Sequence, residues 1–139
     1  MTGGIERMVR LEQANPNIAV IHLAIGRAYA SRARYAHAEV ELQEALRLKP
    51  EDTDAQYVLA TVLFALHRPD EATPLLQTLT TSAANQKDPE LYHRVGKLQL
   101  VNGELKSAIT SLQAAAQLNP GDQGIRDDLA AALHRDAQP

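Results

Sequence analysis

The side chains best suited to acid–base or metal chemistry in this sequence are five histidines and two pairs of adjacent acids. The histidines are His22, His37, His67, His93 and His134. They fall on different predicted helices and turns, without the spacing of metal ligands. The acidic pairs, Asp70–Glu71 and Asp127–Asp128, stand at predicted helix starts, where the helix dipole favours negative charge. Because no HExxH, GxSxG, P-loop or glycine-rich dinucleotide motif is present, we expect no catalysis, no cofactor and no metal.

The composition excludes several further classes of protein. The net charge is −3, so no basic footprint indicates nucleic acid, and the absence of cysteine excludes disulfides and thiolate metal sites. The charge is uneven: residues 1–49 hold seven Lys/Arg against five Asp/Glu, and residues 50–139 hold seven against twelve. No uninterrupted apolar stretch approaches the roughly 18 residues of a membrane span, and the start lacks the apolar core of a signal peptide. We expect a soluble chain, with the cytoplasm favoured over the periplasm. The Arg- and Ala-rich composition favours a bacterial origin.

The elements that would position these side chains are specified by an internal repeat. Small and branched residues return at steps of 34 and then 36 residues. The position of Gly26 returns once more, after a further 34 residues. The recurring sets are Gly26, Ala60, Gly96 and Ala130; Ala38, Ala72 and Ala108; and Leu42, Leu76 and Leu112. Self-similarity at this period predicts an array of helical repeats.

The repeat predicts an all-α fold of about eight helices, paired as antiparallel hairpins in a single domain. The expected segments are an N-terminal half-repeat helix over 4–15, repeats over 19–52, 53–86 and 89–122, and a capping helix over 123–136. We expect the capping helix to keep Leu129, Ala130 and Leu133 on its inner face and polar residues outside, as terminal repeats require. Gly26 and Gly96 predict close helix crossings, with Ala38 and Ala108 opposite them.

The second repeat contains the most irregular joint. Pro74 lies inside its second helix and is expected to bend or delay that helix, since proline cannot donate the backbone hydrogen bond. The stretch SAANQKD, residues 82–88, is expected to form a longer loop with two extra residues.

These recurring residues resemble the tetratricopeptide repeat, over nearly the whole chain. The best-matching unit, residues 19–52, carries His22, Ile25, Gly26, Tyr29, Ala38, Leu42, Ala45 and Pro50. The resemblance implies a right-handed superhelix of helix pairs, an α-solenoid, whose first helices line a concave groove for a peptide or partner protein. His22 stands at a core position of the repeat and is interpreted as a packed structural histidine.

The groove positions of the family place a set of candidate contact residues on this sequence. They are Leu23, Arg27, Tyr57, Thr61, Phe64, His93, Arg94, Lys97 and Leu100. Apolar and aromatic anchors beside basic side chains suggest a peptide or helix with apolar anchors and acidic residues. The alternative is that Arg27, Arg94 and Lys97 are solvated surface charges and that Tyr57 and Phe64 belong partly to the core.

One subclass of the family binds acidic chaperone C-termini through a clamp of Lys and Asn side chains. The clamp positions fall here on Leu23, Arg27, Val58, Glu90 and Arg94. Since an acid stands where a lysine is needed, we do not expect chaperone-tail binding.

Two other functions remain open. The N-terminal helix lacks a preceding repeat partner, so an apolar stripe of Ile5, Met8 and Val9 would favour a homodimer or an array. The chain could also serve as a targeting module of a larger enzyme or of a secretion or assembly machine.

Overall fold

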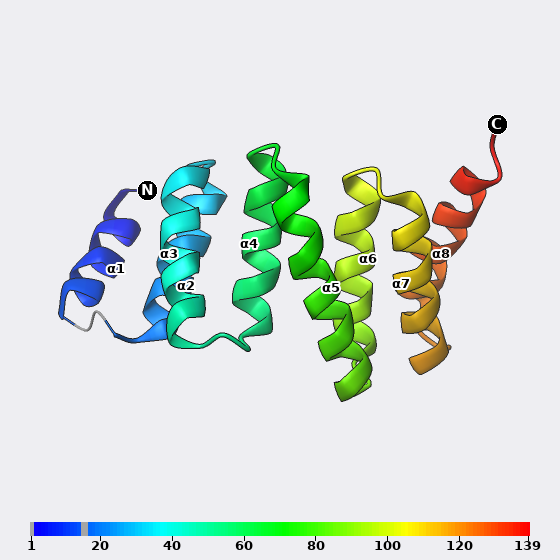
Figure 1. Ribbon diagram of the computed structural model, residues 1–139, viewed down its shortest axis with the longest axis horizontal. Coiled ribbons are helices and arrows are strands. Elements are labelled where there is room, and N and C mark those ends of the chain that lie inside the picture. Colours follow the sequence, from blue (N-terminus) through cyan, green and yellow to red (C-terminus); the bar gives the residue numbers. More distant parts are fainter. Residues whose placement is uncertain (1, 15–16) are drawn as a thin grey trace. The chain divides into compact units, whose positions relative to one another are not determined.

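The computed structural model describes residues 2–14 and 17–139, which form eight α-helices and no strand (Figure 1). The predicted all-α fold is therefore confirmed. The helices are α1 (Thr2–Ala14), α2 (Ala19–Ser31), α3 (Tyr35–Leu48), α4 (Thr53–Ala65), α5 (Pro69–Gln86), α6 (Pro89–Val101), α7 (Leu105–Leu118) and α8 (Gln123–Asp136). They fall into two compact units, Met1–Leu75 and Leu76–Pro139, with the boundary inside α5.

The first unit is built around the α2–α3 hairpin. α4 packs on α3, and α1 packs on α2 (Figure 1). Ile25, Leu42 and Ala45 are completely buried between the helices. Asp52 caps α4 as predicted, because its carboxylate accepts hydrogen bonds from the backbone N–H groups of Asp54 and Ala55.

The second unit repeats this arrangement with the α6–α7 hairpin, and α8 packs mainly on α7. Val95, Leu112 and Ala115 are completely buried, at the positions that Ile25, Leu42 and Ala45 hold in the first unit. Asp88 and Asp122 cap α6 and α8, accepting backbone N–H groups of the first turn.

Both hairpins cross closely at a glycine, as the repeat predicts. A Cβ added at Gly26 would lie 2.8 Å from Cγ of Leu42, and one at Gly96 would lie 2.8 Å from Cγ of Leu112. The alanine opposite contributes its backbone, since the carbonyl oxygen of Ala108 lies 3.4 Å from the same point at Gly96. The leucine side chain, more than the alanine, therefore fills the space that glycine leaves.

The prediction of a loop over residues 82–88 is wrong for residues 82–86, which are helical. α5 continues to Gln86, so the two extra residues lengthen a helix. Only Lys87, in the left-handed conformation with φ 53°, separates α5 from Asp88, the cap of α6. Pro74 does not delay the helix, because α5 already begins at Pro69. The missing N–H of Pro74 costs α5 one backbone hydrogen bond near its start.

The inner face of the capping helix also differs from the prediction. In α8, Ile125 and Ala132 are buried, whereas Leu129 is half-buried and Ala130 is exposed. Leu133 is 43% exposed. Only one side of α8 packs on α7, so the other half of its apolar surface stays in solvent.

None of the helices in the described part of the chain is long and apolar enough to span a membrane.

Candidate partner-binding surface

In the first unit, one face of α4 carries three of the predicted contact residues. Tyr57, Thr61 and Phe64 are spaced by four and three residues, so they lie on the same side of the helix. Thr61 is exposed, and its hydroxyl donates a hydrogen bond to the backbone carbonyl of Tyr57. Both rings are half-buried, which holds them in place and leaves part of each accessible.

Arg27 on α2 lies beside this face. One of its guanidinium nitrogens is 3.9 Å from a carboxylate oxygen of Asp54, which precedes Tyr57 by three residues on α4. About half of each side chain is exposed, and α2 contacts α4 directly. The structure therefore places Arg27 at the Asp54 end of the row formed by Tyr57, Thr61 and Phe64. We call these four residues the α4 face.

Leu23, predicted to belong to this surface, is only 8% exposed. It therefore offers little area to a ligand.

In the second unit, the predicted residues lie on α6. Lys97 is exposed and Arg94 is half-buried, three residues before it. Leu100 is partly buried against the cluster of Ile109, Leu112 and Ala132. The basic pair is thus accessible, whereas much of Leu100 serves the core.

His93 differs from its neighbours, because it is 9% exposed and faces α8. Its Nε2 lies 2.6 Å from a carboxylate oxygen of Asp128. His22 is buried in the same way, with Nδ1 2.9 Å from a carboxylate oxygen of Glu41. The interpretation of His22 as a packed structural histidine is confirmed, and His93 has a similar environment.

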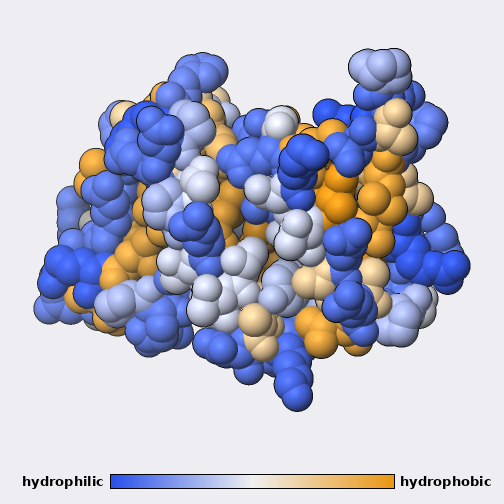
Figure 2. Space-filling model, turned by 45° about the vertical axis from the view of Figure 1, so that its right-hand side comes forward, coloured by the Kyte–Doolittle hydropathy of each residue, from blue (hydrophilic) through white to orange (hydrophobic). Residues whose placement is uncertain are grey.

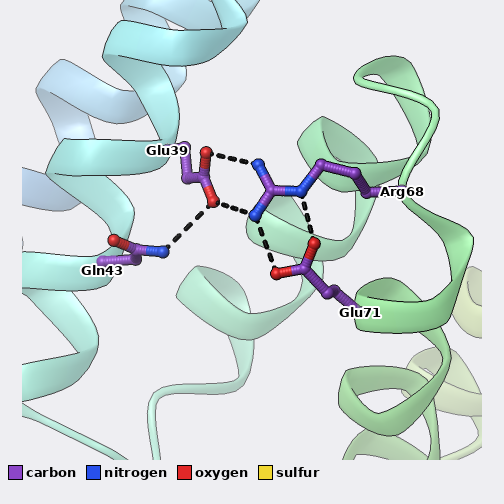
Figure 3. Close-up of polar contacts among 4 residues, drawn as sticks. All are labelled: Glu39, Gln43, Arg68 and Glu71. Carbon is purple, nitrogen blue, oxygen red and sulfur yellow. Dashed lines mark hydrogen bonds and ion pairs between the residues drawn. The ribbon is translucent and has the colours of Figure 1, made fainter.

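A cluster of charges links the first two repeats inside the first unit (Figure 3). The guanidinium of Arg68, in the turn between α4 and α5, donates two hydrogen bonds of 2.8 Å to Glu39 on α3 and further hydrogen bonds to Glu71. Gln43 donates to the same carboxylate of Glu39 at 3.2 Å. Hydrogen bonding from Arg68 lowers the pKa of Glu71, and the two carboxylates raise the pKa of Arg68.

A hollow of about 440 Å³ lies between α1 and the α2–α3 turn. Ile5, Val9 and Tyr29 provide its apolar lining. Three arginines also line it, Arg10, Arg32 and Arg34. Sequence reasoning did not single out these arginines, although the excess of Lys/Arg over Asp/Glu in residues 1–49 points to this region.

A second hollow, of about 530 Å³, lies in the second unit and is lined by hydroxyl and amide side chains of α5, α6 and α7. Thr81, Ser107 and Tyr92 are among them, and no Lys, Arg, Asp or Glu contributes among the described residues. This lining therefore supplies no charge for an acidic ligand.

Figure 2 shows that hydrophobic surface on the visible face is confined to strips between hydrophilic side chains. The exposed apolar side chains of the described residues are likewise spread over several helices, with Val20, Val40 and Val101 the most exposed. A ligand of this surface would need polar groups between its apolar anchors.

Helical hairpins that repeat with one register define the class of helical repeat proteins, and comparison with known sequences supports the family resemblance. Residues 31–95, just under half of the chain, match the family model of the tetratricopeptide repeat. The match confirms the resemblance to tetratricopeptide repeats over this stretch.

Individual relatives are distant. The chain is 27% identical to cellulose synthase operon protein C of Pseudomonas fluorescens (strain SBW25) over an alignment that covers 94% of this chain and 11% of that protein. It is similar to the crystal structure of TTC0263, a thermophilic repeat protein of Thermus thermophilus, with a TM-score of 0.78, 22% identity and coverage of 94% and 71% of the two chains. It is also similar to the first repeat domain of Spaghetti (RPAP3) bound to the HSP90 peptide SRMEEVD, with a TM-score of 0.68, 18% identity and coverage of 86% and 94%.

Proposed function

We propose that this chain is a protein-interaction module that binds a peptide or helix carrying apolar anchors and acidic side chains. The observation that carries the proposal is the α4 face, where Tyr57, Thr61 and Phe64 form one row with Arg27 beside it. Partly buried aromatic rings offer contact area and lose little conformational freedom on binding.

The charge of Arg27 is available to a ligand. Its distance of 3.9 Å from Asp54, with both side chains about half exposed, makes a weak surface pair. A ligand carboxylate can replace Asp54 or approach the guanidinium from the solvent side at little cost.

The ligand that we propose differs from a chaperone tail. A repeat domain of the same fold is bound to the HSP90 peptide SRMEEVD. Here Glu90, at one position of the family's clamp, is exposed in the first turn of α6 and would repel a terminal carboxylate. Apolar anchoring on α4 therefore carries more of the recognition than a terminal carboxylate does.

A display library of 12-residue peptides tests this function directly. We expect selection to enrich peptides with aromatic or aliphatic anchors and at least one Asp or Glu. Arg27→Glu should weaken a selected peptide about tenfold or more, measured by fluorescence anisotropy, because it reverses a charge facing the ligand. Phe64→Ala should weaken it by a similar factor through loss of an anchor.

Arg126→Glu is the matched control, since Arg126 is an exposed arginine of α8 that is not part of the α4 face. It should leave the affinity unchanged. Circular dichroism should show that every variant keeps its helices. Selection of no peptide would contradict the proposed function. Equal affinity of the Arg27 variant and the wild type would show that this charge is merely solvated.

A further inference from the structure

The polar hollow of about 530 Å³ in the second unit lies between three consecutive helices, α5, α6 and α7. Neither end of the chain contributes to it. The described lining consists of amide and hydroxyl side chains, one tyrosine and two alanines, and it includes no Lys, Arg, His, Asp or Glu. Such a lining can form many hydrogen bonds and no ion pair, which favours a neutral polar ligand.

Gln99 of α6 and Ser111 of α7 form the floor of this hollow, since they line it and are only 6% and 3% exposed. The Ser111 hydroxyl donates a hydrogen bond of 2.8 Å to the side-chain oxygen of Gln99. The side-chain nitrogen of Gln99 donates to no described residue, and it is not sealed from solvent. Two N–H donors are therefore available at the bottom of the hollow.

The repeat does not require an amide at the position of Gln99. The equivalent residues of the first two repeats are Tyr29 and Leu63, and Leu63 is 4% exposed in the core. Burying an amide costs free energy unless its polar groups are hydrogen-bonded, so leucine would suit the packing of α6 better. A ligand that accepts from the nitrogen of Gln99 would offset this cost.

The α7 wall of the hollow also differs from its counterpart in the first unit. The equivalent pairs are Ser107 and His37, Thr110 and Val40, and Ser111 and Glu41. In the first unit the rings of Tyr29 and His37 lie 5.1 Å apart, and the hollow that they line measures about 310 Å³. The polar lining is therefore particular to the third repeat and is not a demand of the fold.

The walls offer hydrogen-bond donors and acceptors together. Three threonine hydroxyls donate to backbone carbonyls one turn earlier, so each hydroxyl oxygen can still accept; they belong to Thr80, Thr81 and Thr110. Asn85 of α5 and Ser107 of α7 are exposed, and neither side chain is hydrogen-bonded within the described chain. Both can donate and accept. This matches a ligand whose own groups do the same.

Tyr92 of α6 adds a half-buried aromatic ring to this polar lining. We propose that the hollow binds a neutral oligosaccharide. One face of a pyranose ring carries C–H groups, which pack on the Tyr92 ring, and its hydroxyls both donate and accept hydrogen bonds, as the walls do. The volume lies within the range of about 300–1,000 Å³ that small-molecule sites occupy.

An extended peptide suits the hollow less well than a sugar. Its backbone could bond to the amides, but its side chains would need anchor pockets. Ala84 and Ala114 are the only aliphatic side chains of the described lining, and neither forms such a pocket. No residue of the α4 face contributes to the hollow, so sugar binding is independent of the peptide binding proposed above.

Heteronuclear NMR of the isotope-labelled full chain tests the proposal. The probes are cellotetraose, maltotetraose and tetra-N-acetylchitotetraose, all neutral. At least one should bind saturably and shift the amide signals of residues 77–85, 92, 99 and 107–114. No saturable shift with any of the three, or shifts confined to other residues, would overturn the proposal. The same signals shifted by a selected peptide and by no sugar would assign the hollow to a peptide instead.

Two variants remove polar groups from the hollow. Gln99→Leu combined with Ser111→Ala removes both partners of the floor hydrogen bond, so no buried group is left unpaired, and leucine already holds the equivalent position at Leu63. Asn85→Leu removes an exposed amide from the α5 wall. Each variant should weaken the bound sugar about threefold or more.

Gln86→Leu is the matched control, because it removes an exposed amide from the neighbouring residue of α5, outside the lining. It should leave the affinity for the sugar unchanged, and circular dichroism should show that all the variants keep their helices. Wild-type affinity in both hollow variants, or an equal loss in Gln86→Leu, would overturn the proposal. Arg27→Glu should bind the sugar like the wild type, which separates this test from that of the α4 face.

Discussion

The hairpin turns place one equivalent residue in the left-handed backbone conformation. Ala33 and His67 have φ values of 59° and 60°, and Gly103 has 81°. Only the turn between α6 and α7 uses glycine, the residue that adopts this conformation without strain. An L-residue in this region costs about 1–2 kcal/mol, so the first two turns store strain that the third avoids.

Replacing the strained residues should therefore stabilise the protein. Ala33→Gly and His67→Gly should each raise the free energy of unfolding by up to about 1 kcal/mol, part of the relief being offset by the greater freedom of glycine in the unfolded chain. Urea denaturation followed by circular dichroism measures the change. Gly103→Ala is the reciprocal control and should destabilise by a similar amount. Destabilisation by both glycine substitutions would mean that their side chains contribute more than the turn strain costs.

Glycine at the helix crossing has a different role, which concerns space. An added Cβ at Gly96 would lie 2.8 Å from Cγ of Leu112, inside normal contact distance. Gly96→Leu should therefore lower the free energy of unfolding by about 1–3 kcal/mol through overpacking, with a lower melting temperature. Gly121→Leu is the control, since no atom lies within 4 Å of a Cβ there. An unchanged melt of Gly96→Leu would mean that α6 and α7 can separate without loss of packing.

At the scale of the elements, Arg68 connects three helices of the first unit. Its guanidinium, in the turn after α4, is held by Glu71 of α5 and by Glu39 of α3. The planar group with several N–H donors can satisfy both carboxylates together, which a lysine ammonium cannot do with the same geometry. The cluster therefore fixes the α4–α5 turn on the preceding repeat.

The contribution of Arg68 should depend on pH. Arg68 lowers the pKa of Glu71 below its ordinary value of 4.5, so their interaction stabilises the fold above that pH and is lost as the pH falls through the lowered pKa. Arg68→Met should lower the melting temperature at pH 7, and the difference from wild type should shrink below about pH 4.5. Thermal melts at both pH values measure this.

Arg47→Met is the matched control for this experiment. Arg47 hydrogen-bonds only to Glu44, within α3, so it links no other helix in the described chain and its removal should have a smaller effect at pH 7. A difference between Arg68→Met and wild type that is the same at both pH values would assign the role of Arg68 to its packing alone.

Periodicity predicted which segments form helices, because a repeat of 34 to 36 residues constrains every copy at once. It failed at residues 82–86, where Ser, Ala, Asn and Gln indicate a loop by composition and yet continue α5. These small polar residues carry no local signal that tells whether the helix ends before them or continues through them. Asp88 caps the next helix, α6, so only Lys87 is left to connect it with the end of α5 at Gln86.

At the scale of the whole molecule, the candidate site could be predicted only in part. Register placed Arg27, Tyr57, Thr61, Phe64 and Lys97 on first helices, where the structure has them exposed or half-buried. Register could not show which of these side chains neighbouring helices cover. His93 is covered because Asp128 faces it, and that pairing of residues 35 positions apart depends on the identity of both.

Helix contacts in the described chain join elements that are neighbours or next-neighbours in order. Stability in such an array is approximately a sum of repeat and interface terms, so each added hairpin gains the packing of one interface.

This neighbour-only connectivity also determines how the chain responds to a pulling force. Within each unit, tension is resisted by the packing of helices on their neighbours and next neighbours. We expect each hairpin to open when its own interface fails, so that the extension of the chain grows in steps of about one repeat. We also expect the hairpins to re-form one by one when the load is removed.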